Sequence, residues 1–141
     1  MMNKPQKMIL VVAAALVDPD GRVLIAQRPE GKVMAGLWEF PGGKVEAAER
    51  PEDALIRELA EELSITVREP CLAPLTFASH SYESFHLLMP LYVCRRWEGT
   101  AVAHHHAALK WLRPKDLMRD SAAYPMPAAD LPLLPMLRDL L

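Results

Sequence analysis

Three glutamates, Glu58, Glu61 and Glu62, lie within five consecutive positions of the segment "PEDALIRELAEEL", residues 51–63. At 100° per residue on an α-helix they fall at relative angles of about 0°, 300° and 40°, so they share one face. Pro51 suits the first turn of such a helix, because the missing N–H of a proline costs nothing there. The sequence therefore predicts a helix over this whole segment, with three carboxylates on one side.

The crowding of these carboxylates needs an explanation. Like charges at i,i+3 and i,i+4 spacing repel by a few tenths of a kcal/mol per pair. The apolar side chains fall on a different arc of the helix. A hard divalent cation such as Mg²⁺ or Mn²⁺, which prefers oxygen ligands, would offset the repulsion. A solvated acidic face with Arg57 as ion-pair partner explains the helix equally well, so the helix alone leaves both interpretations open.

Apolar runs separated by turn signals predict strands on both sides of this helix. The runs Met8–Val17 and Val23–Ile25 flank the turn sequence Asp18–Gly21, which favours a hairpin. Pro90 interrupts a later apolar run and favours a bulge or an edge position for that strand. Strands before and after a helix, followed by a final helix, indicate a mixed α/β domain. The other expected elements are a glycine-rich loop over 29–45, strands over 72–79, 85–95 and 108–112, a helical turn over 114–118, an ordered loop over 121–132 and a closing helix over 131–141.

Composition argues against several classes of partner. A formal net charge of -2 gives no reason to expect a nucleic-acid polymer or an anionic membrane as the main partner, and no obligate protein partner is evident. Lys4 and Lys7 precede an apolar run and imitate a signal peptide, but the hairpin explains that run. No apolar stretch approaches the roughly 18 residues that span a bilayer. Cys71 and Cys94 show no paired spacing, so we expect a soluble, cytoplasmic protein with reduced thiols in preference to a disulfide.

The residues around the acidic helix follow a longer pattern. Gly43 is followed after five residues by Glu49, and after seven more by Arg57-Glu58-Leu59 and Glu61-Glu62. This order resembles the Nudix box, with Ser64 where that family has glycine. Serine there adds backbone strain if φ is positive. The resemblance implies the Nudix fold, an α/β/α sandwich around a mixed β-sheet, with residues 1–141 as a single Nudix hydrolase domain.

The resemblance extends beyond the box. The stretch "LWEFPGGKVE" at 37–46, with Arg28 upstream and "RWEG" at 96–99 downstream, is similar to the MutT branch, which sanitises oxidised nucleoside triphosphates. That resemblance implies catalytic roles for Arg57 and the three glutamates, and contacts to substrate from residues before the box. It makes Glu58, Glu61, Glu62 and the carbonyl of Gly42 the metal ligands, lets Arg57 orient Glu58 with Glu49 packed against it, aims Arg28 at a substrate phosphate, and sets Glu39 and Phe40 beside the nucleoside.

Hydrolysis of a nucleoside triphosphate needs cations that neutralise the phosphoryl oxygens and polarise a water. By resemblance we expect a small-molecule nucleotide substrate, Mg²⁺ as cofactor with Mn²⁺ as an alternative, and release of a monophosphate and pyrophosphate. Asp130 aligns with the residue that reads the purine edge in MutT relatives. An ionised Asp only accepts hydrogen bonds, and guanine offers N1–H and the N2 amino group, so 8-oxo-dGTP is the leading substrate. Capping of the closing helix is the competing role for Asp130.

Other functions remain open at this stage. The chain could act on another nucleoside diphosphate-linked substrate, be a non-hydrolytic module like the lesion-recognition domain of an adenine glycosylase, or be a regulatory Nudix protein. MutT relatives also carry a loop glutamate six residues before the late-strand tryptophan, where this chain has His105. That histidine could serve as base or metal ligand, or the position could be catalytically empty, which we expect. For the run 104–106 we expect a solvated loop, because adjacent histidines rarely point at one ion.

Overall fold

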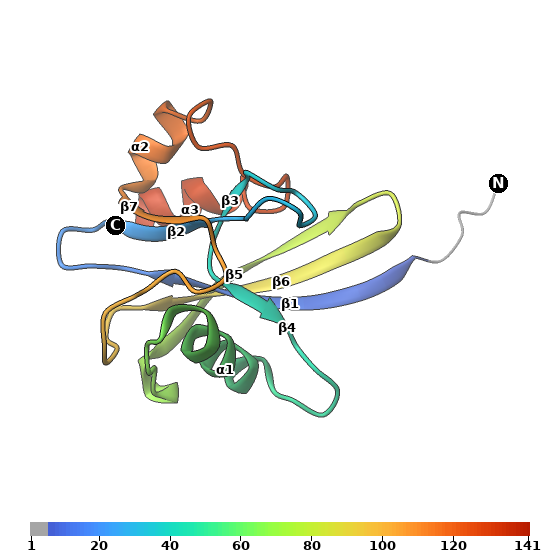
Figure 1. Cartoon of the computed structure of the whole chain (residues 1–141), viewed down its shortest axis with the longest axis horizontal. Coiled ribbons are helices and arrows are strands. Elements are labelled where there is room, and N and C mark those ends of the chain that lie inside the picture. Colours follow the sequence, from blue (N-terminus) through green and yellow to red (C-terminus); the bar gives the residue numbers. More distant parts are fainter. Residues whose placement is uncertain (1–5) are drawn as a thin grey trace.

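The computed structural model describes residues 6–141, which form two β-sheets with helices against them (Figure 1). The strands are β1 (Lys7–Leu16), β2 (Val23–Gln27), β3 (Trp38–Glu39), β4 (Gly42–Lys44), β5 (Leu72–Ser81), β6 (Phe85–Cys94) and β7 (Ala108–Leu112). The helices are α1 (Pro51–Leu63), the 3₁₀ turn η1 (Glu69–Cys71), α2 (Pro114–Arg119) and α3 (Leu133–Leu140). One sheet has the order β4-β1-β6-β5 and the other β3-β2-β7. Since β1 runs parallel to β6 and antiparallel to β4, the first sheet is mixed.

Strand β1 separates two apolar cores, because successive side chains of a strand point to opposite faces. Val12, Ala14 and Leu16 pack in the core that contains the buried face of α1. Ala13 and Ala15 pack in the other core, together with residues of α2 and α3. In Figure 1, α1 lies on one side of the four-stranded sheet and α2 and α3 lie on the other. This arrangement confirms the expected α/β/α sandwich around a mixed sheet.

Helix α1 covers the same residues that the sequence predicted. Its buried side chains include Leu55, Leu59 and Leu63, which leaves the carboxylates beside the apolar stripe. The helix ends at Ser64, which has φ 58° and ψ 33° in the left-handed region. The N–H groups of Ser64 and Ile65 turn back to carbonyls of the last helical turn. The sequence position where Nudix proteins have glycine therefore does require a positive φ.

Two expectations for the strands were wrong in detail. The runs before the helix do form strands, but β1 and β2 share only the bridge Val17–Val23 and belong to different sheets, so they are not a regular hairpin. The loop expected over 29–45 contains the short strands β3 and β4. Strand β4 pairs with β1, and at Gly42 the absence of a side chain allows a close approach of the two backbones. Short segments with two glycines gave no strand signal in the sequence.

Pro90 lies in β6, an interior strand, so the expected edge position was also wrong. The parallel pairs with β1 step from Leu10–Leu88 to Ala13–Leu91, and Pro90 falls between them, where no N–H is needed. The register shift lies on the neighbouring strand β5, between Pro74 and Thr76. The later elements match their expected ranges closely. Within residues 6–141, no helix is long and apolar enough to cross a membrane.

Variants of Ser64 test the strained end of α1. Ser64→Gly should change the free energy of unfolding by less than about 1 kcal/mol, because relief of the left-handed conformation is offset by a more flexible unfolded chain. Ser64→Val should destabilise the protein by about 2 kcal/mol, because a β-branched residue resists positive φ. Urea unfolding at equilibrium measures both values. Equal stability of the valine variant and the parent protein would contradict a left-handed conformation at this residue.

Candidate active site

The carboxylate face of α1 borders a cavity of about 380 Å³. Residues from the loop after β2, from β3, from α1 and from the loop before β7 surround it. The structure thus brings the three helix glutamates together with four residues that lie earlier in the chain, between positions 28 and 39. The lining consists of Arg28, Pro29, Lys32, Glu39, Glu58, Glu61, Glu62, His105 and His106.

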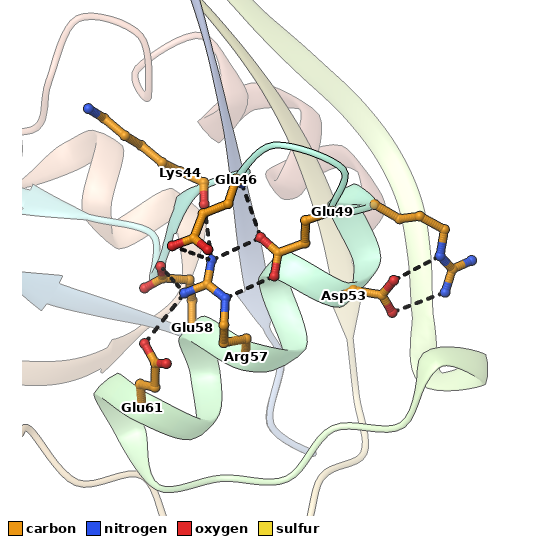
Figure 2. Close-up of polar contacts among 8 residues, drawn as sticks. Lys44, Glu46, Glu49, Asp53, Arg57, Glu58 and Glu61 are labelled. Atoms are coloured by element: carbon orange, nitrogen blue, oxygen red, sulfur yellow. Dashed lines mark hydrogen bonds and ion pairs between the residues drawn. The ribbon is translucent and has the colours of Figure 1, made fainter.

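Arg57 is the centre of the polar network beside this cavity (Figure 2). Its Nε and Nη2 donate to the two carboxylate oxygens of Glu49, at 2.9 and 3.0 Å. Its Nη1 donates to Glu58 at 2.9 Å and to Glu61 at 3.4 Å. Nη2 also reaches the carbonyl of Lys44 in β4, at 3.3 Å. The Arg57 hydrogen bonds hold the pKa of Glu49 below its usual value and tie the helix to the loop and strand that precede it.

The two glycines of β4 leave room for different neighbours. A Cβ on Gly43 would lie 2.4 Å from Cδ of Glu58, so this carboxylate can occupy its position only against a glycine. A Cβ on Gly42 would lie 1.9 Å from the carbonyl oxygen of Val12, so Gly42 is needed for the pairing of β4 with β1. Sequence reasoning assigned the carbonyl of Gly42 to a metal, and the structure places Gly42 beside a second cavity that also contains Glu58 and Glu62.

The acidic side chains differ in exposure. Glu58 is 15 % exposed and Glu61 is 58 % exposed. Burial, together with the carboxylates of Glu58 and Glu39, raises the pKa of Glu62 to about 7, although His106 opposes that shift. Carboxylates crowded in this way are stabilised by a cation.

The donor set therefore fits a hard divalent ion in residue type. In the described residues 6–141, no three acidic, histidine or cysteine side chains converge at metal-binding distance, and Arg57 donates to oxygens of both Glu58 and Glu61.

The second cavity, of about 430 Å³, shares Arg28, Glu39, Glu58 and Glu62 with the first. It extends the first cavity toward the apolar core that contains residues of α2 and α3. At its far end the backbone N–H of Phe40 donates to the carboxylate of Asp130 at 3.3 Å. Together the two cavities form one cleft with a charged end and a more apolar end. The remaining lining residues of the second cavity are Val11, Val12, Ala13, Phe40, Gly42, Gly43, Lys44, Met89 and Asp130.

Asp130 does not cap the closing helix, so the competing role that the sequence suggested for it is wrong. Helix α3 begins at Leu133 and has no side-chain cap hydrogen bond. The Asp130 side chain is 4 % exposed and accepts its hydrogen bond from Phe40, far away in sequence. Burial raises the pKa of Asp130 to about 7, the Phe40 N–H lowers it, and the nearby Glu39 raises it further. The carboxyl group therefore changes protonation near neutral pH.

The run of histidines at 104–106 is divided among three environments. The backbone N–H of His104 donates to the carbonyl of Glu62 at 3.2 Å, and its imidazole contacts the hydroxyl of Ser64. His105 is exposed and lines the first cavity. The side chain of His106 is buried, and its Nε2 contacts Glu39 at 3.1 Å. The inward position of His106 could not be predicted from the sequence, because no periodicity in a loop indicates which of three adjacent side chains points inward.

Arg28 and Glu39, which the sequence analysis assigned to phosphate and nucleoside, form an ion pair at the junction of the two cavities. Nη1 of Arg28 lies 3.1 Å from Oε1 of Glu39. Nε of Arg28 donates to the carbonyl of Val33 at 2.6 Å. Nη2 has no hydrogen-bond partner in the part of the chain that the structure describes, so one edge of the guanidinium remains available to a ligand.

Comparison with known proteins places this site in a family. The model of the NUDIX domain matches residues 12–136. The CTP pyrophosphohydrolase of Escherichia coli K12 is 45% identical over 132 residues, which cover 91% of this chain and 90% of that protein. The 8-oxo-dGTP diphosphatase of Proteus vulgaris is 40% identical over 99 residues, covering 70% and 85%.

Two solved structures show the same fold. The E. coli ORF135 protein superposes with a TM-score of 0.80 at 38% identity, over 96% of this chain and 91% of its own. A MutT NUDIX hydrolase from Burkholderia pseudomallei superposes with a TM-score of 0.80 at 29% identity, covering 93% and 98%.

Alanine at the two glycines should separate folding from site geometry. Gly43→Ala should leave the free energy of unfolding within about 1 kcal/mol of the parent, because the flexible end of Glu58 can move away. Its activity should fall at least about tenfold, since Glu58 is displaced. Gly42→Ala should destabilise the protein by more than about 2 kcal/mol, because its Cβ meets backbone. Urea unfolding measures the stability of the two variants, and pyrophosphate release measures their activity. Full activity in Gly43→Ala would contradict the placement of Glu58.

Proposed function

The chain belongs to the Nudix hydrolase family, and from this premise we propose that it is a Mg²⁺-dependent nucleoside triphosphate pyrophosphohydrolase. Its products would be a nucleoside monophosphate and pyrophosphate, and its substrate a free nucleotide of the cytoplasm. The observation that carries the proposal is the network in which Arg57 holds Glu58 and Glu61 beside a cavity that also contains Arg28. The complete charged set of the box, Arg57, Glu58, Glu61 and Glu62, argues against a purely binding role.

Nudix hydrolases generally use divalent metal ions, and this chain offers oxygen ligands for one. Glu58, Glu61, Glu62 and the carbonyl of Gly42 would hold Mg²⁺, with Mn²⁺ as an alternative. When bound, the ion neutralises charge on phosphoryl oxygens and polarises the attacking water. Arg57 keeps Glu58 oriented, because its Nη1 donates to Oε1 of that carboxylate.

The charged end of the cleft suits the triphosphate and the apolar end suits the nucleoside. Arg28 and Lys32 supply positive charge at the first cavity. Phe40 and Met89 supply apolar surface at the second, where Asp130 is the buried polar group that can read the edge of a base. This separation supports a substrate with several phosphates and one base.

Two bases match Asp130, depending on its protonation. An ionised carboxylate offers only acceptors, which suit N1–H and the N2 amino group of a guanine, and this supports 8-oxo-dGTP. A protonated carboxyl offers one donor and one acceptor, which suit N3 and the N4 amino group of cytosine. The pyrophosphohydrolase of E. coli that is 45% identical to this chain is named for CTP, which makes cytosine the second candidate. We propose an oxidised guanine nucleotide as the main substrate.

Loss of a single helix carboxylate tests the metal site. Glu61→Gln or Glu62→Gln should lower turnover at least about 100-fold with Mg²⁺, because charge stabilisation by the ion is weakened. Pyrophosphate release over a panel of nucleotides measures this, and urea unfolding should show an intact fold. Glu69→Gln is the matched control, since Glu69 pairs with Arg50 outside the cleft. Near-normal turnover in both cleft variants would contradict the proposed metal site.

The preference between the two bases should depend on pH, because the hydrogen-bonding groups of Asp130 change when it is protonated. Its folded pKa is about 7, so the carboxyl group loses its proton as pH rises through neutrality. The ratio of kcat/KM for CTP to that for 8-oxo-dGTP should therefore fall at least about tenfold between pH of about 6 and about 8. Asp130→Asn, which cannot ionise, should abolish that dependence. A ratio that varies equally in the parent and in Asp130→Asn would exclude Asp130 as the group that reads the base.

A further inference from the structure

The carboxylate of Glu39 is held by two side chains from different parts of the chain. Nη1 of Arg28 lies 3.1 and 3.4 Å from its two oxygens, and Nε2 of His106 lies 3.1 Å from Oε2. His106 is 5 % exposed, Glu39 21 % and Arg28 31 %. Burial therefore increases from the guanidinium through the carboxylate to the imidazole, and His106 is the inner end of a chain of contacts that reaches the cleft.

The imidazole of His106 has one nitrogen that the fold does not use. A carboxylate only accepts, so Nε2 carries the hydrogen and donates it to Glu39. Nδ1, an acceptor in the neutral ring and a donor in the protonated one, is buried with no hydrogen-bond partner in residues 6–141. A buried unpartnered polar nitrogen costs stability in either state. A leucine would fill this space without that cost, so packing alone does not explain a histidine here, whereas the donor to Glu39 does.

The backbone around His106 is fixed on both sides. The N–H of His104 donates to the carbonyl of Glu62 at the end of α1, and the N–H of Ala107 donates to the carbonyl of Gln27 at the end of β2, at 2.9 Å. The loop thus spans from the helix with the acidic face to the strand that leads into Arg28. His106 is presented to Glu39 by anchored backbone.

We propose that His106 is a positioning residue that sets the guanidinium of Arg28 for binding the triphosphate. The proposal rests on the function proposed above. Oε2 of Glu39 is shared between His106 and Arg28, so the imidazole limits how far the carboxylate draws the guanidinium. Without His106, both oxygens are free to form a fork-to-fork pair with Arg28, which occupies the edge that is otherwise available to a phosphate. In this role His106 acts on Arg28 through the carboxylate of Glu39.

Three substitutions at His106 separate this role from packing. His106→Leu fills the space and removes the donor, so it should fold and bind triphosphate about tenfold more weakly. His106→Gln places an amide N–H near the position of Nε2 and should restore affinity to within about twofold of the parent. His106→Asn is too short to reach Glu39 and should resemble leucine. His86→Leu is the matched control, because the ring nitrogens of His86 bond to the hydroxyls of Ser79 and Ser81 and the residue lines neither cavity.

The readouts are the dissociation constant of inorganic tripolyphosphate, from calorimetry with Mg²⁺, and KM and kcat for pyrophosphate release. The Leu and Asn variants should raise the dissociation constant and KM with kcat changed less than about threefold. In a Glu39→Gln background the His106→Leu effect should shrink to less than about twofold, because the competing carboxylate is absent.

Equal affinity for tripolyphosphate in the parent, His106→Leu and His106→Gln would overturn the proposal, as would an undiminished His106→Leu effect in the Glu39→Gln background. So would an absence of tripolyphosphate binding in the parent. A parent that binds tripolyphosphate in the expected order of variants but hydrolyses no nucleotide would instead overturn the proposed function and leave the role of His106 supported.

Discussion

The guanidinium of Arg57 joins three segments that the sequence separates. It donates to Glu49 in the loop before α1, to the carbonyl of Lys44 in β4, and to Glu58 and Glu61 on the helix. These bonds are charge-assisted, and the pair with Glu49 is two-pronged, so the direction of the side chain is fixed. Because β4 pairs with β1 and approaches its backbone closely at Gly42, the acidic face of α1 is fixed relative to the central sheet.

The same interaction explains how the chain tolerates so many carboxylates. Arg57 compensates the outer part of the cluster, near Glu49, Glu58 and Glu61, and Glu62 is left in the interior of the cleft. Burial and neighbouring acids raise the pKa of Glu62, which shows that the compensation is incomplete at that end. A cation would have its largest effect there. The fold therefore concentrates unbalanced negative charge on the side of α1 that faces the cleft.

The sequence predicted the helices and strands whose positions depend on local interactions. The extent of α1 follows from helix periodicity and Pro51, and the strands follow from apolar runs. The division into two sheets could not be predicted, because one of the two partners of β2 is β7, some eighty residues later, and only tertiary packing selects it. The bond between Phe40 and Asp130 was equally invisible, since no spacing rule links positions so far apart. The resemblance to a family supplied the roles for these residues, and geometry alone distinguished His106 from His105 in the loop.

The ion pair of Arg28 and Glu39 connects the two ends of the cleft. It borders both cavities, and the pKa of Asp130 responds to both members, since Glu39 raises it and Arg28 lowers it. A triphosphate that draws Arg28 away from Glu39 would weaken the effect of Arg28, which lowers the pKa of Asp130. The effect of Glu39, which raises that pKa, would remain, so the protonated carboxyl would be favoured. Under the proposed function, binding at the phosphate end would therefore shift the hydrogen-bonding character of Asp130 at the base end. The ion pair proposed to bind the phosphates would thereby also take part in the choice of base.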